Sequence, residues 1–212
     1  QITLQSYLKC VGTASFFSFI FRREISMGNF NLLCLGDVVG PDTLSCMQKN
    51  LGAIRRKYDV SMVVANGENA SEGNGINPDD AEDLFTAGVD VITSGNHVWK
   101  KNRIYSYLDD KEEIIRPANY PSSAPGKGYT IFETGVASVL VINVLGTMFM
   151  DPLACPFETV DKILEREKGR YDISVLDIHA EATAEKKALG YYLDGRVNAI
   201  FGTHTHVTTA DE

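Results

Sequence analysis

The sequence predicts an α/β fold in which ligands bind beyond the carboxyl ends of the strands. Apolar runs of strand character alternate with helical segments from Asn31 onward, which is typical of repeated strand–helix units. Several of these runs end in Gly followed by a polar residue, and open α/β sheets bind their ligands at such ends. The chain has 212 residues, 44% of them apolar, so it can bury one sizeable core and requires no second domain.

The expected elements follow from hydrophobic periodicity and from local start and stop signals. Pro78 begins a segment with acids in its first turn and Gly88 closes it, which predicts helix 78–87. Segments 129–133 and 138–143 are expected to form a hairpin, which makes the sheet mixed. The other expected strands are 31–36, 61–65, 89–93, 172–177 and 197–201, and the other helices lie near 43–57, 100–108, 157–168 and 182–190.

The first 26 residues differ from the rest of the chain and are expected to lie outside the catalytic domain. An aromatic stretch at 16–21 is followed by two arginines, and the first methionine is Met27. The sequence therefore predicts an extension at 1–26, non-native or disordered, and a domain at 27–212. The alternative for the extension is a membrane-surface anchor. Its apolar part is too short to span a bilayer and its charges follow that part, so no membrane partner is expected.

Net charge and cysteine spacing narrow the class of protein. The formal charge of −8, from 20 basic and 28 acidic residues, argues against a broad surface for long nucleic acids. A small phosphate ester remains compatible, because metal ions neutralise its charge locally. The four cysteines form no CxxC pair, and Cys34 and Cys46 fall in an expected core strand and helix. Reduced thiols and a cytoplasmic location are predicted, with disulfides or metal ligation as the alternatives.

All four histidines follow apolar runs of strand character, which points to a metal site. They occur in Gly-Asn-His-Val (95–98), Asp-Ile-His-Ala (177–180) and Gly-Thr-His-Thr-His-Val (202–207). A lone histidine is more often structural than a ligand, but here every histidine shares the same kind of position. The two histidines of the last pattern are two residues apart, so they are expected on the same side of an extended chain. Together with oxygen donors at other strand ends, the candidate ligands are Asp37, Glu68, Asn96, His179, His204 and His206.

This donor set has more members than a single four-coordinate ion needs, which predicts two metal ions bridged by one carboxylate. Oxygen and nitrogen donors without a thiolate favour iron, manganese or zinc over Cu(I) and over an all-oxygen magnesium or calcium site. A two-metal centre suits hydrolysis at phosphorus, and the leaving alkoxide then needs a proton. His97, next to Asn96, is the candidate proton donor, and its alternative role is to orient a ligand.

Several sequence blocks resemble those of a known family. They are Gly-Asp-Val-Val-Gly (36–40), Asn-Gly-Glu-Asn-Ala (66–70), Ser-Gly-Asn-His-Val-Trp (94–99), Arg-Pro-Ala-Asn-Tyr-Pro (116–121), Asp-Ile-His-Ala-Glu-Ala-Thr (177–183) and the segment 194–207 that ends in Thr-His-Thr-His-Val. Over residues 29–212 the chain is similar to the YmdB family of bacterial calcineurin-like metallophosphoesterases.

The resemblance implies a fold, an activity and a set of roles. The implied fold is a calcineurin-like sandwich of two mixed β-sheets flanked by helices. The implied activity is that of a 2′-phosphodiesterase, in which a hydroxide activated by two divalent or trivalent metal ions, with iron expected first, converts 2′,3′-cyclic nucleotides to 3′-nucleotides. The implied roles are one metal held by Asp37, Asn69 and His206, a bridge from Glu68, a second metal held by Asn96, His179 and His204, and proton donation by His97.

Some alternatives stay open at this stage. Asn69 is either a ligand or a turn residue whose side chain bonds the backbone. The whole protein is either the phosphodiesterase, a regulatory protein that binds a nucleotide with little turnover, or a generic phosphomonoesterase. Members of the family continue beyond the block at 209–211, so a C-terminally truncated domain is expected. A homo-oligomer is compatible with the sequence.

Overall fold

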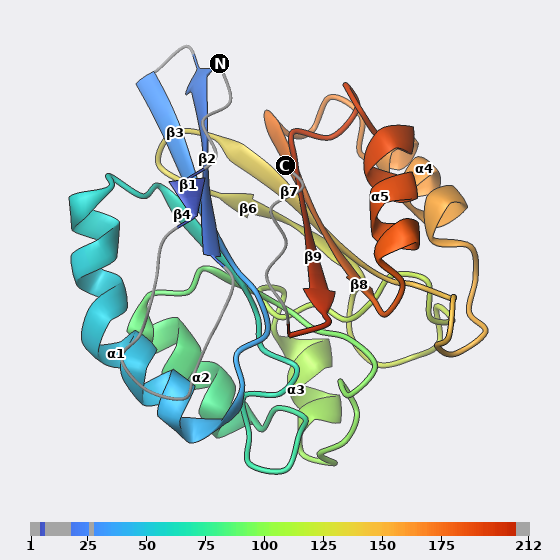
Figure 1. Cartoon of the computed structure of the whole chain (residues 1–212), viewed down its shortest axis with the longest axis horizontal. Coiled ribbons are helices and arrows are strands. Elements are labelled where there is room, and N and C mark those ends of the chain that lie inside the picture. Colours follow the sequence, from blue (N-terminus) through green and yellow to red (C-terminus); the bar gives the residue numbers. More distant parts are fainter. Residues whose placement is uncertain (1–4, 7–17, 26–27, 207–212) are drawn as a thin grey trace.

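Two mixed β-sheets lie between two layers of helices (Figure 1). The computed structural model describes residues 5–6, 18–25 and 28–206. The first sheet has the strand order β1-β2-β3-β4-β5 and the second the order β6-β7-β8-β9, so the predicted α/β class with two mixed sheets is confirmed. The strands are β1 (Gln5–Ser6), β2 (Ser18–Ile25), β3 (Gly28–Leu35), β4 (Met62–Asn66), β5 (Val91–Thr93), β6 (Tyr129–Glu133), β7 (Ser138–Leu145), β8 (Ile173–Ala180) and β9 (Ala199–His204).

Each sheet contains three neighbouring parallel strands. In the first sheet β3, β4 and β5 are parallel, and β2 pairs antiparallel with β3. In the second sheet β7, β8 and β9 are parallel, and β6 pairs antiparallel with β7 as the expected hairpin. The carboxyl ends of the parallel strands therefore meet at one edge of each sheet, where the following turns can present polar side chains together.

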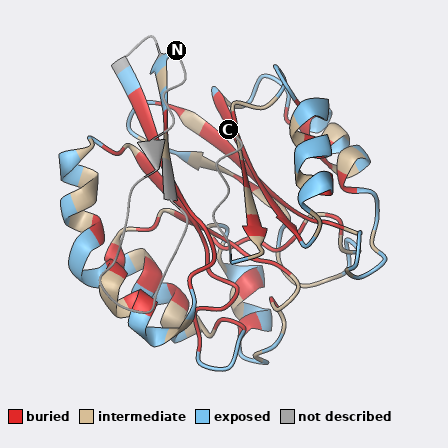
Figure 2. Ribbon diagram, in the orientation of Figure 1, coloured by how far each residue is buried: buried red, intermediate tan, exposed pale blue. Residues whose placement is uncertain are grey.

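Helices cover the outer face of each sheet. Helices α1 (Gly40–Lys57), α2 (Pro78–Ala87) and α3 (Ile104–Asp110) pack on the first sheet, and α4 (Pro156–Arg166) and α5 (Thr183–Tyr192) pack on the second. Figure 2 shows the consequence, with buried residues concentrated in the strands and exposed residues on the outer helix faces. This is the burial expected of helices with one apolar stripe.

A separate apolar cluster fills the space between the two sheets. Successive side chains of a strand point to opposite faces, so alternate residues of each strand turn toward the other sheet. From the first sheet this cluster includes Leu32, Cys34, Met62, Val64 and Val91, and from the second it includes Val139, Val141, Ile173, Val175 and Phe201. The residues of this cluster fix the distance between the sheets and hence between their carboxyl ends.

The predicted elements occur, with shifts at some ends. Helix α2 has the predicted bounds, and Gly88 closes it in the left-handed region, with φ at 109°. Helix α3 begins at Ile104 and not near 100, because turns occupy the preceding residues. Strand β8 extends to Ala180 and not to 177, since it pairs with a strand on each side. His179 therefore lies inside a strand, not after one.

The amino-terminal segment differs from the predicted extension where the structure describes it. Residues 18–25 form strand β2, and Phe21 is buried in the cluster between the sheets. This part is therefore an ordered element of the first sheet. Apart from Gln5–Ser6, the remainder of 1–26 lies outside the described residues, so the domain boundary at residue 27 stays a prediction.

The thiol prediction needs one correction. Cys34 and Cys155 are free, but Cys46 is disulfide-bonded. Cys46 lies on a partly exposed side of α1, and not in the core as the sequence predicts. Cys10 lies outside the described residues.

The cytoplasmic location, which rested on reduced thiols, remains a prediction. Within the described residues, no helix has the length and apolar character that a bilayer crossing requires.

The burial of α2 predicts the stability cost of one core substitution. Leu84 is fully buried against the first sheet, so Leu84→Ala is expected to lower the free energy of unfolding by about 2–5 kcal/mol. Thr86→Ala, at an exposed position of the same helix, is expected to change it by about 0.5 kcal/mol or less. Urea unfolding followed by circular dichroism measures both, and equal effects would contradict the described packing of α2.

Candidate metal centre

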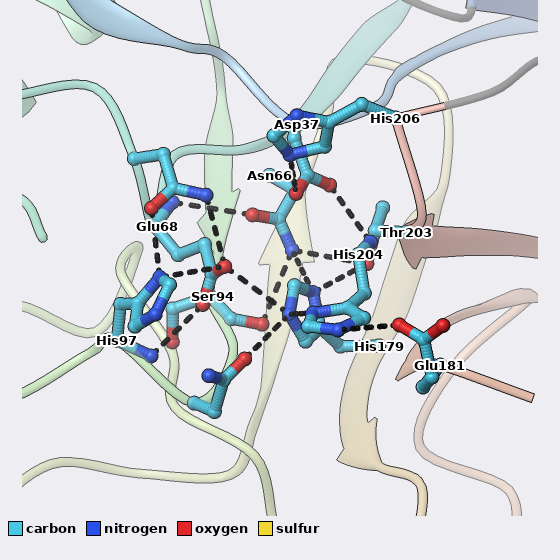
Figure 3. A network of polar contacts seen from close by, with 12 residues as sticks. Asp37, Asn66, Glu68, Ser94, His97, His179, Glu181, Thr203, His204 and His206 are labelled. Atoms are coloured by element: carbon cyan, nitrogen blue, oxygen red, sulfur yellow. Dashed lines mark hydrogen bonds and ion pairs between the residues drawn. The ribbon is translucent and has the colours of Figure 1, made fainter. Parts of the chain in front are cut away.

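The predicted site residues come together where the carboxyl ends of the two sheets meet (Figure 3). Asp37 follows β3, Glu68 and Asn69 follow β4, and Asn96 and His97 follow β5. The second sheet contributes the histidines of β8, of the last position of β9 and of the turn after it. The structure thus brings together side chains from the ends of five strands. Two of them that are in contact, Asp37 and His206, are 169 residues apart in the chain.

One group of the site is formed by Glu68, His179 and His204, of which the first two are fully buried. The Nε2 atom of His179 lies 3.2 Å from Glu68 Oε1 and 3.1 Å from His204 Nδ1. One ligand atom from each residue lies within 4.8 Å of the others, as a metal ion requires. Asn96 completes this group, with its Oδ1 atom 3.1 Å from His179 Nε2. These are the residues that the resemblance assigns to the second metal and to the bridge.

Asp37 and His206 form a neighbouring pair. The Nε2 atom of His206 lies 2.9 Å from Asp37 Oδ2, and the backbone N–H of His204 donates to Asp37 Oδ1 at 3.1 Å. Burial alone would raise the pKa of the Asp37 carboxyl, but the contact with His206 and the charge of His179 outweigh it and lower the pKa. Asp37 is therefore held as an anion beside the first group.

One expectation for this loop is wrong. His204 and His206 were expected on the same side of an extended chain, but His204 has φ at 87°, which turns the chain out of the extended conformation. The imidazole of His204 consequently lies against His179, with its Nε2 3.0 Å from Glu181, and the imidazole of His206 lies against Asp37. One short loop thus supplies a donor to each half of the site.

Glu68 lies at the centre of the site and is fully buried. Its carboxylate accepts hydrogen bonds from the backbone N–H of His97 and from the Asn69 side chain, each at 3.0 Å. Burial raises the pKa of Glu68, but the contact with His179 and the His97 N–H outweigh it, so the pKa is lowered. A Cβ at Gly95 would overlap His179 Nε2 and Glu68 Oε2, so only glycine fits there.

Asn69 and His97 lie together on the other side of Glu68. The Nδ1 atom of His97 lies 2.9 Å from Asn69 Oδ1 and 3.3 Å from Glu68 Oε1. The Asn69 amide is therefore directed at Glu68 and His97, and its oxygen, the atom that a metal would need, accepts from His97. The neighbouring side chains of residues 68 and 69 both reach the site because the chain turns after β4.

Sequence reasoning missed a group of buried polar residues directly beneath the site. We call it the inter-sheet polar cluster, and its members are Asn66, Thr93, Asn143, Asp177 and Thr203. Each member stands two residues after an apolar residue that faces the space between the sheets. The sequence contained a signal for these residues. Side chains of a strand alternate between its two faces, so counting two residues on from the last apolar residue that faces the other sheet identifies every member.

Asp177 is the centre of this cluster and has no exposed surface. Its carboxylate accepts hydrogen bonds from Thr93 at 2.6 Å, from Thr203 at 2.8 Å and from the Asn66 amide at 2.9 Å. Burial raises the pKa of Asp177 to about 6, although the nearby charge of His179 and these hydrogen bonds lower it in part. The cluster therefore joins the two sheets, since Thr93 and Asn66 belong to the first and Asp177 to the second.

The donor atoms fit a bound cation. Glu68 Oε1 and Asn96 Oδ1 both approach His179 Nε2, and neither oxygen carries a hydrogen. When the proton of the imidazole is on Nδ1, lone pairs face one another, and a cation among them satisfies all three atoms. Carboxylate, amide and imidazole donors without a thiolate are the set that iron, manganese and zinc accept.

Comparison with known proteins agrees with this geometry. The family model described as YmdB-like protein matches residues 33–212. A protein of Bacillus subtilis strain 168 named 2′,3′-cyclic-nucleotide 2′-phosphodiesterase is 41% identical over 180 residues, which cover 85% of this chain and 68% of that protein. A putative phosphatase/phosphodiesterase of Mycoplasma pneumoniae is 36% identical over 87% of this chain and 67% of its own length.

Solved structures show the same likeness in three dimensions. The crystal structure of a hypothetical protein from Thermus thermophilus has a TM-score of 0.80 and 45% identity, and covers 85% of this chain and 69% of its own. A novel phosphatase from Mycoplasma pneumoniae also has a TM-score of 0.80, with 34% identity over 86% of this chain and 66% of its own. The chain spans about two thirds of the length of these relatives, and it belongs to the YmdB-like family of phosphoesterases.

Proposed function

We propose that this protein is a dimetal-dependent phosphodiesterase that hydrolyses 2′,3′-cyclic nucleotides to 3′-nucleotides. The observation that carries the proposal is the convergence of carboxylate, amide and imidazole donors around the fully buried Glu68 carboxylate. The name of the Bacillus subtilis relative supports the choice of substrate. A buried carboxylate among histidines has little structural use on its own and a clear use in holding cations.

The ligand roles follow the two halves of the site. We assign Asn96, His179 and His204 to one ion, Asp37, Asn69 and His206 to the other, and Glu68 to the bridge. Asn69 must turn its oxygen away from His97 to serve as a ligand. The ions, with iron first and manganese or zinc as alternatives, would activate water and neutralise the charge on the phosphoryl oxygens.

The chain's own groups would then position and protonate the substrate. In the proposed reaction, water adds to phosphorus, the bond from phosphorus to the ribose 2′ oxygen breaks, and that oxygen takes up a proton. His97 is the proposed donor of this proton. Its Nδ1 is held by Asn69 and Glu68, which leaves Nε2 available to the leaving oxygen. The side chain is 22% exposed, so a ligand can reach it from solvent.

Metal content and turnover test the proposal together. The purified chain loaded with Mn²⁺ or Fe²⁺ is expected to bind about two ions and to convert 2′,3′-cyclic AMP to 3′-AMP over many turnovers. Glu68→Ala is expected to lose both ions and all activity, because the bridge is removed. Metal analysis and chromatography of the products measure these outcomes.

The other candidate functions give different results in the same assay. Two ions with saturable nucleotide binding and no product would indicate a regulatory binding protein. Faster cleavage of simple monoesters than of cyclic diesters would indicate a phosphomonoesterase. The word phosphatase in the names of two relatives is the reason to include this candidate. Either result would overturn the proposed activity and leave the metal centre standing.

The role of His97 predicts a separation of binding from catalysis. His97→Ala is expected to keep both metal ions and to lower kcat by about 10²- to 10⁴-fold, the usual contribution of a positioned proton donor. A substrate with a good leaving group, such as a nitrophenyl phosphodiester, needs no protonation and is expected to lose much less. Unchanged turnover of the cyclic nucleotide in this variant would show that another group supplies the proton.

His179 and Glu68 lie so close to Gly95 that adding one methyl group at this position is expected to affect metal binding. Gly95→Ala places a Cβ against His179 and Glu68, so it is expected to abolish metal binding at the shared group. Gly135→Ala is the matched control, because a Cβ there meets nothing within 4 Å. Calorimetric titration with Mn²⁺ compares the two variants, and retained affinity in Gly95→Ala would contradict the described geometry.

A further inference from the structure

We propose that the hydroxyl of Tyr120 binds the substrate by donating a hydrogen bond to a phosphoryl oxygen of the bound phosphate ester. The proposal deepens the proposed function, on which it rests, by adding a substrate contact that neither the metal ligands nor His97 supply. Tyr120 belongs to the segment 116–121, which contains none of the proposed ligands.

The segment that carries Tyr120 runs along the carboxyl end of β7. The backbone N–H of Ala118 donates to the carbonyl of Asn143, a member of the inter-sheet polar cluster, at 2.7 Å. The buried Asn119 side chain bonds both the N–H and the carbonyl of Leu145, the last residue of β7, each at 2.8 Å. Tyr120 follows directly, so it stands at the edge of the sheets where the metal ligands lie.

A buried arginine fixes the shape of this segment. The guanidinium of Arg116 donates to four backbone carbonyls, which are those of Pro117, Pro121, Ala124 and Pro125. Two of these carbonyls lie on either side of Tyr120 in the sequence. The backbone that carries the phenol is therefore held from within, and the position of the ring is set before any ligand binds.

The ring of Tyr120 packs against Trp99. The two ring centroids are 4.5 Å apart and the ring planes are inclined by 72°, which is an edge-to-face contact. The indole N–H of Trp99 is buried and has no hydrogen-bond partner among the described residues, so this ring contributes packing and no polar contact. Trp99 lies two residues after His97, and the contact therefore places the phenol on the His97 side of the site.

The Tyr120 hydroxyl has no hydrogen-bond partner within the part of the chain that the structure describes, although the side chain is half-buried. Burial raises the pKa of Tyr120 to about 12, and the charges of Asp151 and Glu68 act in the same direction. The phenol thus lies in the field of the central carboxylate of the site and keeps a proton to donate. A fixed hydroxyl without a partner does not stabilise the fold, but it is suited to holding a ligand.

The assignments already made indicate which atom the hydroxyl contacts. His97 is assigned to the ester oxygen that leaves, so the non-bridging oxygens on this side of the phosphorus need another donor. A phenol supplies a neutral donor, and its hydrogen bond to a charged phosphoryl oxygen is stronger than one between two neutral groups.

Calorimetric titration of the Mn²⁺-loaded chain with inorganic phosphate tests the proposal. Tyr120→Phe keeps the ring that packs on Trp99 and removes only the hydroxyl. This variant is expected to bind Mn²⁺ as the wild type does. It is expected to bind phosphate about 10- to 100-fold more weakly, the usual contribution of a hydrogen bond to a charged group.

Tyr171→Phe is the matched control. Tyr171 is also half-buried and its hydroxyl also has no partner among the described residues, but it stands just before the amino end of β8, away from the site. Its loss is expected to leave phosphate binding unchanged. Equal phosphate affinity in the wild type and a folded Tyr120→Phe would overturn the proposal, and so would a wild type that binds no phosphate.

A measurement on the wild type decides the proposal even if Tyr120→Phe fails to fold. In protein labelled with ¹³C at the ζ carbon of tyrosine, the Tyr120 signal is expected to shift when phosphate binds, and the Tyr171 signal is expected to stay. A Tyr120 signal that does not respond to bound phosphate would contradict the contact. Weaker binding of 3′-AMP by Tyr120→Phe with unchanged phosphate binding would also contradict it, because the hydroxyl would then contact the nucleoside.

These results separate the inference from the proposed function, because phosphate binding is measured without turnover. Weaker phosphate binding by Tyr120→Phe together with no hydrolysis of a cyclic nucleotide by the wild type would overturn the proposed reaction and leave the contact standing. Hydrolysis of 2′,3′-cyclic AMP with the same kcat/KM and the same phosphate affinity in both proteins would do the reverse.

Discussion

The arrangement of the site depends on burying the Asp177 carboxylate between two sheets. A carboxylate without exposed surface is tolerated only when hydrogen bonds replace its lost water, and those bonds come from strands of both sheets. Strands β4, β5, β8 and β9 must therefore hold one register relative to one another at their carboxyl ends. The apolar cluster below sets the spacing of the sheets, and this polar cluster sets how their ends align.

The site stands on rigid elements rather than on long loops. His179 is inside a strand that pairs on both sides, and Glu68 lies two residues after the end of the fully buried strand β4. The backbone of Asn69 is held beside the first motif by a bridge to Val39. Donors placed in this way reach a ligand with little loss of conformational freedom, which is why short turns after parallel strands suit metal centres.

Much of this arrangement could be predicted from the sequence, because it depends on short local patterns of residues. The bounds of α2 follow from Pro78 and Gly88, and the donors stand where apolar runs end. What local patterns lack is the relation between strands. The extension of β8 past His179 depends on its two neighbours, the direction of His204 depends on one positive φ, and the pairing of Asn69 with His97 depends on a turn. Strand β2 was missed although its partner β3 follows it directly in the sequence.

The left-handed backbone of His204 restricts which amino acids can stand at that position. A φ of 87° is unfavourable for β-branched and bulky side chains and is best tolerated by glycine, followed by asparagine, aspartate and histidine. Glycine offers no donor, and the shorter side chains of asparagine and aspartate do not extend from His179 to Glu181 as the imidazole does. The backbone conformation and the contacts of the imidazole therefore favour the same residue independently, so position 204 is under two separate constraints.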